Sequence, residues 1–166
     1  MAAVGLLLDR AGAGSGGVLV VYGPPGAGRT ALAEAAAGEG RRRGFAVARV
    51  GVAATGPARM AWAQLIRQTG GPTALARRLL EEAGPLELDD AAEALVSDGP
   101  RLIVVDDVDR RGPAAVEFLP VLAARVGGSS TAVIVTASAP LGTGQELRLA
   151  PLGEQDLGAA VAEGRP

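Results

Sequence analysis

Short apolar runs alternate with longer segments of helix-forming residues, and this alternation constrains the fold more than any other feature. Four runs have strand length and are bounded by Gly, Pro, Asp or Ser: Val18–Tyr22, Phe45–Val50, Leu102–Val105 and Ala132–Thr136, with a weaker fifth at Glu146–Leu149. Three of the first four are almost uninterrupted, which is typical of parallel strands covered on both faces. The sequence therefore predicts an α/β fold with a doubly wound, mostly parallel sheet.

The segments between these runs are rich in Ala, Leu and Arg, which favour helices. The predicted helices are Arg29–Ala37, Ala58–Thr69, Thr73–Ala83, Asp89–Val96 and Pro113–Val126, with a short one near Glu154–Ala162. Gly38 and Gly40 weaken the end of the first helix. Pro120 removes a helical hydrogen bond and predicts a kink or a break in the fifth. We expect one domain, 1–166, in which residues 151–166 are either its end or a stub of a helical lid.

The composition excludes several classes of function. With 0 Cys and 0 His, the chain cannot form disulfides, thiolate metal sites, histidine zinc sites or a His-based catalytic triad. A net charge of −2 offers no basic footprint for nucleic acid. No apolar run approaches the roughly 20 residues that span a bilayer. Met1–Leu8 is apolar but lacks a basic leader, so we expect no signal peptide, no membrane partner and a cytoplasmic location.

One segment carries the pattern of a phosphate site. It follows the first apolar run, opens the first predicted helix, and reads Gly23-Pro24-Pro25-Gly26-Ala27-Gly28-Arg29-Thr30. This is the P-loop spacing G-x-x-x-x-G-K-[ST], with Arg29 in place of Lys. Left-handed Gly26 and Gly28 would turn the N–H groups of residues 27–30 toward phosphates at the helix N-terminus. The Thr30 hydroxyl is a candidate Mg²⁺ ligand. The alternative is a plain Gly-Pro turn between a strand and a helix.

A second candidate site follows the run Leu102–Val105, where two acids stand together. Ligands in open α/β sheets bind at the carboxyl ends of the strands, which is where Asp106 and Asp107 are expected. We predict that Asp106 holds Mg²⁺ through water and that Asp107 orients the attacking water. Asp109 is predicted to be a solvated turn residue or a helix cap. Taken alone, the acids also suit an exposed turn.

Other features favour ordinary structural roles. The run Arg41-Arg42-Arg43 is typical of a solvated helix end, and Trp62 lies on an apolar helical face and is expected in the core. Arg110 and Arg111 could reach a γ-phosphate, although a surface charge pair is the simpler interpretation. Gly12–Gly17 is predicted to be a loop that leads into the first strand.

Together the two motifs resemble a known family. The sequence is similar to the ATPase module of STAND/AAA-type NTPases, which are found in actinobacterial LuxR-type and SARP-type transcriptional regulators. The similarity is carried by the stretches VLVVYGPPGAGRTAL and RLIVVDDVD and by the segment between them, Ala61-Trp62-Ala63-Gln64-Leu65-Ile66-Arg67. The resemblance spans roughly Leu6 to Ala162. It implies ATP or ADP with Mg²⁺, a regulatory switch, and a regulatory protein partner or self-association. It makes Leu147 to Leu152 the last core strand and the start of a lid. The chain itself has no room for a DNA-binding element.

The sequence departs from that family in three places. Family members carry Lys at the position of Arg29, a His-Trp pair at Val108-Asp109-Arg110, and an Arg at the end of the fourth strand. Here that strand ends Thr136-Ala137-Ser138, so Thr136 or Ser138 is a candidate γ-phosphate sensor. Arg is a planar fork and not a point charge, so we expect nucleotide binding to survive and ATP hydrolysis to be weak or absent, with Arg29 and Asp107 as the catalytic side chains. The alternatives are a degenerate interaction module that keeps the fold without nucleotide, and a small P-loop kinase.

Overall fold

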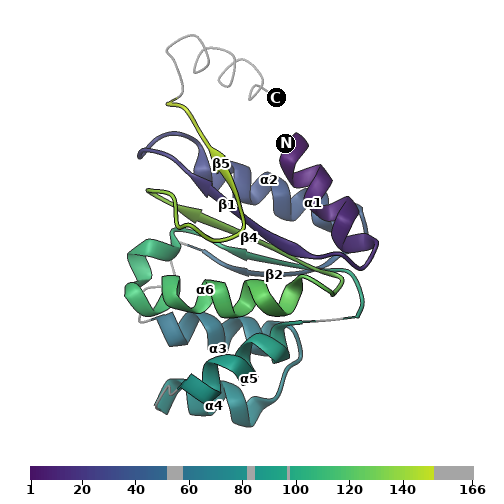
Figure 1. Ribbon diagram of the computed structural model, residues 1–166, viewed down its shortest axis with the longest axis vertical. Coiled ribbons are helices and arrows are strands. Elements are labelled where there is room, and N and C mark those ends of the chain that lie inside the picture. The colour runs from purple at the N-terminus through teal and green to yellow at the C-terminus, as the bar shows by residue number, and fades with distance from the viewer. Residues whose placement is uncertain (52–57, 82–84, 97, 152–166) are drawn as a thin grey trace, which may run out of the picture.

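A five-stranded sheet forms the centre of the part of the chain described by the computed structural model, residues 1–51, 58–81, 85–96 and 98–151 (Figure 1). In chain order the elements are α1 (Ala2–Gly12), β1 (Gly17–Tyr22), α2 (Arg29–Arg42), β2 (Ala46–Val50), α3 (Ala58–Gln68), α4 (Thr73–Glu81), α5 (Pro85–Leu95), β3 (Arg101–Val105), the 3₁₀ turn η1 (Val108–Arg111), α6 (Pro113–Val126), β4 (Thr131–Ala137) and β5 (Gln145–Arg148).

The strands lie in the order β2-β3-β4-β1-β5, and every pairing is parallel. β1 is therefore flanked by β4 and β5, and β3 lies on the other side of β4. The carboxyl ends of these strands meet at one edge, where β1 continues into the P-loop and β3 into η1. The predicted doubly wound parallel sheet is confirmed, and its topology brings both candidate motifs to the same edge.

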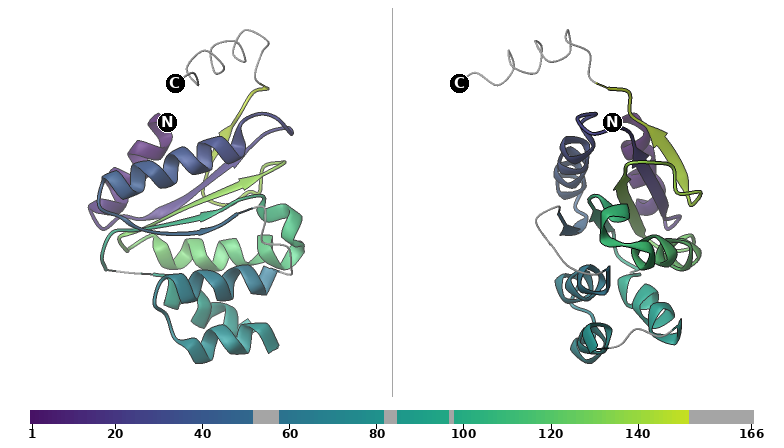
Figure 2. Two further views of the ribbon diagram at one scale, coloured as in Figure 1. Left: turned by 180° about the vertical axis from the view of Figure 1, so that it is seen from behind. Right: turned by 90° about the vertical axis from the view of Figure 1, so that its left-hand side faces the viewer.

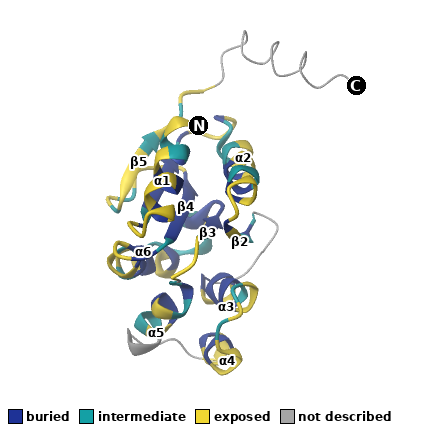
Figure 3. Cartoon of the chain, turned by 90° about the vertical axis from the view of Figure 1, so that its right-hand side faces the viewer, coloured by how far each residue is buried: buried dark blue, intermediate teal, exposed yellow. Residues whose placement is uncertain are grey.

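Helices cover both faces of the sheet, and an apolar cluster fills each side (Figures 1 and 2). α1 and α2 lie over one face. α3 and α6 lie over the other, and α4 and α5 pack outside them. The cluster under α3 and α6 contains Trp62 of α3 and Phe118 of α6, whose ring centroids are 4.5 Å apart. Trp62 is 1% exposed, as its predicted core role requires. Figure 3 shows the central strands as the most buried part of the chain.

α1 is a helix that the sequence analysis did not assign. Its residues Val4, Leu7, Leu8 and Ala11 are buried against β1 and β4, at the spacing of one helical face. Arg43, at the end of α2, ties α1 in place by donating to Gly5 O at 3.1 Å and pairing with Asp9 at 2.7 Å. The loop predicted over Gly12–Gly17 is present but shorter, because α1 ends at Gly12 and β1 begins at Gly17.

Two predicted weak points do not interrupt their helices. α2 runs through Gly38 and Gly40 to Arg42, because Gly40 is buried where the helix passes over β3. A Cβ at Gly40 would stand 2.7 Å from Leu102 Cδ2, so a larger residue here requires the buried Leu102 side chain to shift. The prediction at Pro120 was a kink or a break, and there is no break: α6 is one helix, and Pro120 lies on its exposed side, where water can satisfy the freed carbonyl.

The remaining boundaries differ little from the prediction. Residues 152–166, which include the predicted helix Glu154–Ala162 and nearly all of the predicted lid stub, lie outside the described residues. None of the described helices is both long and apolar enough to cross a membrane.

Candidate functional site

The predicted phosphate-binding segment forms a tight loop between β1 and α2. Gly26 and Gly28 have φ angles of 81° and 84°, the left-handed conformation that glycine adopts without steric cost. Ala27 N–H donates to Pro24 O at 3.2 Å and closes the loop, so this donor, predicted to face phosphate, is already used. Gly28 directly precedes α2, and the first N–H groups of a helix have no helical acceptor. The loop therefore presents free donors at the positive end of the α2 dipole.

The other residues of the segment surround this nest of N–H groups. Pro24 and Pro25 are exposed, whereas Gly23 is buried against the end of β5. A Cβ at Gly23 would stand 2.7 Å from the Leu149 carbonyl oxygen, so the loop can begin here only with glycine. Thr30 lies exposed in the first turn of α2, where its hydroxyl is open to a ligand.

Arg29 lies across the site and does not extend into solvent. Its Nη1 donates to Gly23 O at 3.0 Å, and its Nη2 pairs with Asp107 Oδ1 at 3.0 Å. The two side chains are only 12% and 10% exposed. The guanidinium therefore connects the beginning of the P-loop to the acid after β3, and the two motifs form one charged site.

The two acids after β3 are held by a single hydroxyl. Thr136 Oγ1, fully buried in β4, donates to Asp106 Oδ1 and accepts from Asp107 N–H at 2.7 Å. Asp107 has a φ of 49°, an unusual conformation for a residue with a side chain that Asp tolerates better than most. Thr136 thus positions both acids, and its hydroxyl is engaged with them.

Asp106 has one carboxylate oxygen to spare. Asp106 is fully buried, and its Oδ2 has no hydrogen-bond partner among the described residues. A buried carboxylate oxygen without a partner is costly, and a cation at this position would relieve that cost. No group of three or more His, Cys, Asp or Glu among the described residues could hold a metal. Mg²⁺ usually takes one or two carboxylates together with phosphate oxygens and water, so these residues fit a magnesium ion bound with a nucleotide.

Asp109 has a role that the sequence analysis missed. Its Oδ2 accepts from Ser138 N–H at 2.9 Å and from the Ser138 hydroxyl, which joins η1 to the end of β4. Burial of Asp109 raises the pKa of its carboxyl, but the hydrogen bonds from Ser138 and the charge of Arg29 outweigh burial and lower that pKa below its ordinary value. Only the strand order, which places η1 beside the end of β4, reveals this contact.

Arg110 and Arg111 follow the acids and separate in the structure. Arg110 is 74% exposed and lies 3.6 Å from Asp107 Oδ2, which suits the predicted surface charge pair. Arg111 Nη2 instead donates to Gly51 O at 2.6 Å, at the end of β2. Burial lowers the pKa of Arg111, and the nearby Asp106 and Asp107 carboxylates oppose that shift. Arg111 therefore fastens η1 to the neighbouring strand.

Solved structures with a similar fold are matched along almost the whole chain. A DNA replication initiation factor matches with a TM-score of 0.61 at 16% identity, over 98% of this chain and 48% of the other. AMPPCP-bound DnaA from Aquifex aeolicus matches with 0.57 at 17%, over 98% and 49%. The Drosophila ORC bound to DNA matches with 0.63 at 19%, over 99% and 45%. At these identities the similarity shows the fold alone, and the chain spans about half the length of these proteins.

Sequence comparison gives the family. No curated protein matches the chain. A family model, the AAA ATPase domain, matches residues 1–135, which hold the P-loop, both acids after β3 and most of β4. The matched part is well over half of the sequence, and its motifs occupy the sheet edge where the loop, the acids and Thr136 meet. The chain therefore belongs to the AAA ATPase domain family.

Proposed function

We propose that this chain is the core of a regulatory switch that binds ATP or ADP with Mg²⁺ and hydrolyses ATP weakly or not at all. The observation that carries the proposal is the pair of left-handed glycines, Gly26 and Gly28, at the N-terminus of α2. Alternating backbone handedness at a helix N-terminus turns several N–H groups toward one point, which suits an anion such as phosphate. The AAA ATPase domain family and the AMPPCP-bound DnaA support adenine nucleotide as the source of that phosphate.

The metal part of the proposal rests on Asp106 and Thr30. We infer that the free Oδ2 of Asp106 and the exposed Thr30 hydroxyl hold Mg²⁺ beside the phosphates. When bound, the ion would neutralise phosphate charge next to the two acids. Thr136 binds Asp106 Oδ1 and leaves the buried Oδ2 without a partner among the described residues.

The weak-hydrolysis part rests on Arg29 and Asp107. Asp107 is the candidate to orient an attacking water, yet in the structure it is paired with Arg29. Asp107 Oδ1 is therefore occupied by Arg29 and cannot orient a water until that pair separates. Arg29 also reaches back to Gly23 O, so its fork must leave two partners before it can follow a phosphate.

The first alternative, a module that keeps the fold without nucleotide, is separated by binding. The test pairs two glycines with similar backbone angles: Gly26 in the P-loop, φ 81°, and Gly14 between α1 and β1, φ 80°. A Cβ at either position meets nothing within 4 Å, so Gly26→Ala and Gly14→Ala each cost about 1–2 kcal/mol of backbone strain. We expect calorimetry to show Mg·ADP binding to wild type and Gly14→Ala, and at least about tenfold weaker binding to Gly26→Ala. Absence of binding to wild type refutes the nucleotide function.

The second alternative, a P-loop kinase, is separated by product. We expect wild type to release little phosphate from ATP and to form no phosphorylated acceptor. Arg29→Lys restores a single point charge and should hydrolyse ATP at least about tenfold faster, with ADP affinity nearly unchanged. Equal steady-state phosphate release from both proteins would show that Arg29 already serves as the catalytic cation.

The regulatory context comes from the resemblance to STAND-type modules of LuxR-type and SARP-type regulators. We include in the proposal a regulatory protein partner or self-association, a cytoplasmic location, and one domain over 1–166. The solved relatives that bind DNA are about twice as long as this chain. We do not propose DNA binding here, because the chain has a net charge of −2.

A further inference from the structure

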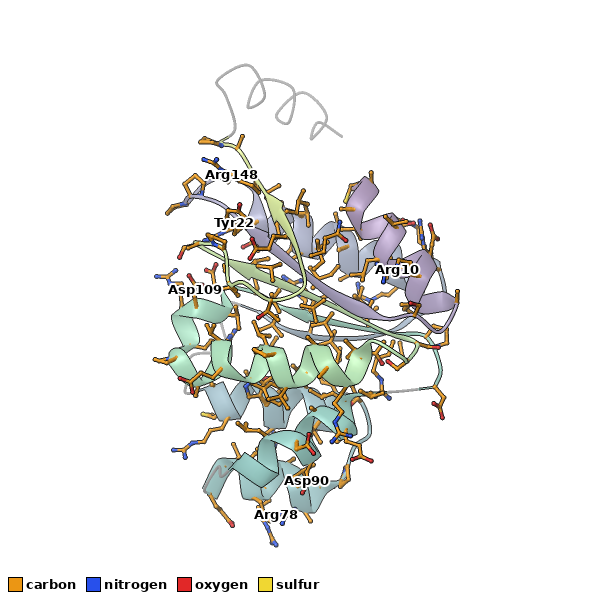
Figure 4. All side chains as sticks on the ribbon, in the orientation of Figure 1. Arg10, Tyr22, Arg78, Asp90, Asp109 and Arg148 are labelled. Atoms are coloured by element: carbon orange, nitrogen blue, oxygen red, sulfur yellow. The ribbon has the colours of Figure 1, made fainter. Side chains whose placement is uncertain are left out.

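A pocket of about 470 Å³ lies beside the P-loop, and the proposed function gives it no role. It lies between Gly23 and Pro24 at the start of the P-loop, Ser138 at the end of β4, and Tyr22 and Arg148 on neighbouring strands. Among the described residues that line it, Arg148 is the only charged one. Figure 4 shows Arg148, Tyr22 and Asp109 along one side of the molecule, at the sheet edge that carries the site.

The pairing of β1 and β5 explains why Arg148 faces this pocket. Arg148 lies directly opposite Tyr22 in the parallel register. Leu147 and Leu149 pack into the cluster under α1 and α2, and alternate side chains of a strand point to opposite faces. Arg148 therefore turns to the opposite face of the sheet, the one covered by α3 and α6, and it lines the pocket together with Ser138. No hydrogen bond or ion pair joins its side chain to another described residue.

The pocket borders the end of the P-loop that lies farthest from the α2 N-terminus. Gly23, part of the pocket wall, accepts the hydrogen bond from Arg29, whose other branch reaches Asp107. A phosphate chain that starts in the nest at Gly28 and extends past Arg29 toward the acids would end beside this wall. A diphosphate is one phosphate shorter and would reach less far along the loop.

The charges at this end call for another cation. Asp106, Asp107 and Asp109 lie around the end of β3 and η1, and the charges of Arg29, Arg110 and Arg111 are already engaged with these carboxylates. A terminal phosphate would add negative charge that these three arginines do not offset. The polar groups at the end of β4 are already engaged, since Thr136 binds the two acids and Ser138 donates both hydrogens to Asp109. Arg148 is the cationic residue of the pocket lining, and its side chain is not engaged with another described residue.

We propose that Arg148 contacts the terminal phosphate of a nucleoside triphosphate and lets this core distinguish ATP from ADP. The inference rests on the proposed function, which requires only that a nucleotide binds. It adds the residue that distinguishes a triphosphate from a diphosphate. A charge-assisted hydrogen bond made with ATP and absent with ADP gives a difference in affinity, and that difference is what a two-state switch requires.

The test compares Arg148→Gln with Arg10→Gln as a matched control. Arg10 is an exposed arginine on α1, on the opposite side of the molecule from Arg148 in Figure 4. Arg10→Gln therefore removes the same charge at a position far from the pocket. Calorimetric titrations use ADP and the non-hydrolysable ATP analogue AMPPCP. We expect Arg148→Gln to weaken AMPPCP binding about tenfold and ADP binding less than about twofold, and Arg10→Gln to change neither. Arg148→Lys should recover part of the loss, because it keeps the charge.

A second arm uses tripolyphosphate and pyrophosphate, which carry no base. Tripolyphosphate should show the same dependence on Arg148 as AMPPCP, and pyrophosphate should show none. If Arg148→Gln weakens AMPPCP and ADP equally and leaves tripolyphosphate unchanged, the pocket reads the base or ribose and the inference is overturned. It is also overturned if no affinity changes while wild type binds ADP, an outcome that leaves the proposed function standing. If wild type binds neither nucleotide, both proposals fail.

Discussion

Removing the acid that holds Arg29 should tighten nucleotide binding, although it removes a predicted catalytic residue. In the structure Arg29 Nη2 lies 3.0 Å from Asp107 Oδ1, and both side chains are nearly buried. A phosphate must draw Arg29 away from this partner or share it. Asp107→Asn keeps the shape of the side chain and removes the charge that competes. Asn also tolerates the left-handed conformation at this position, where φ is 49°, so the backbone should keep its course.

The structure sets the scale of the effect. At 3.0 Å and an effective dielectric constant of about 20, the gross attraction in the pair is about 5.5 kcal/mol. Most of this is offset by the desolvation of both groups. Asp107 Oδ1 has no hydrogen-bond partner among the described residues, so the contact is an ion pair without hydrogen-bond geometry. Its net worth is therefore at most the lower end of the range for a hydrogen bond between charged groups, about 1.5–3 kcal/mol. Because the guanidinium keeps its bond to Gly23 O, we take the lower end. Asp107→Asn should therefore lower the Kd of ADP about tenfold, and lost repulsion between Asp107 and phosphate acts in the same direction.

The assay is calorimetric titration of ADP in EDTA, where no metal contributes, with steady-state phosphate release from ATP measured in parallel with Mg²⁺. Asp109→Asn is the matched control, because Asp109 also lies on η1 and its charge interacts with Arg29 without an ion pair between them. We expect the control to change ADP affinity less than about threefold. Asp107→Asn should bind more tightly and hydrolyse more slowly than wild type. Unchanged or weaker ADP binding would refute the competition between Asp107 and phosphate for Arg29.

The remaining predictions concern the metal, the packing of α2, and pH. Asp106→Asn should abolish the Mg²⁺ dependence of ADP affinity and leave metal-free affinity nearly unchanged, measured by the same titrations. Gly40→Ala should destabilise the fold by about 1–3 kcal/mol through its clash with Leu102, whereas Gly38→Ala should stabilise it by up to about 1 kcal/mol in urea unfolding. The lowered pKa of Asp109 stabilises the fold above the ordinary aspartate pKa of about 3.9, and this contribution disappears as pH falls through the folded-state value. Asp109→Asn should therefore cost stability at pH 7 and much less at pH 3.

Features that depend on neighbouring residues could be predicted from the sequence. The left-handed glycines of the P-loop follow from a spacing of a few residues, and the two acids follow directly from the strand before them. The parallel sheet follows from apolar runs that do not alternate. α1 carries the same kind of local signal, since Val4, Leu7, Leu8 and Ala11 recur at helical spacing. The same short apolar segment also suits a leader peptide, so the sequence alone does not single out the helix.

Features that depend on strand order could not be predicted. Arg29 and Asp107 are far apart in sequence, and they meet because β1 and β3 lie on either side of β4. The same order brings Asp109 to Ser138, so a residue expected to be solvated becomes a link between two elements. Arg148 faces the P-loop only because β5 pairs with β1 in a register that sets it opposite Tyr22. The sequence identifies the chemical groups of the site, but the topology decides which of them are engaged.

This distinction changes the meaning of the arginine in the P-loop. From the sequence, Arg29 is a misfitted replacement for the usual lysine, and its planar fork is a defect for phosphoryl chemistry. In the structure the fork has a use, because two of its nitrogens reach Gly23 O and Asp107 at the same time, each at 3.0 Å. A lysine ammonium is a compact point charge and fits this two-branched geometry less well. An arginine here therefore favours an arrangement in which Arg29 neutralises Asp107, and under the proposed function a phosphate that draws Arg29 away would release Asp107.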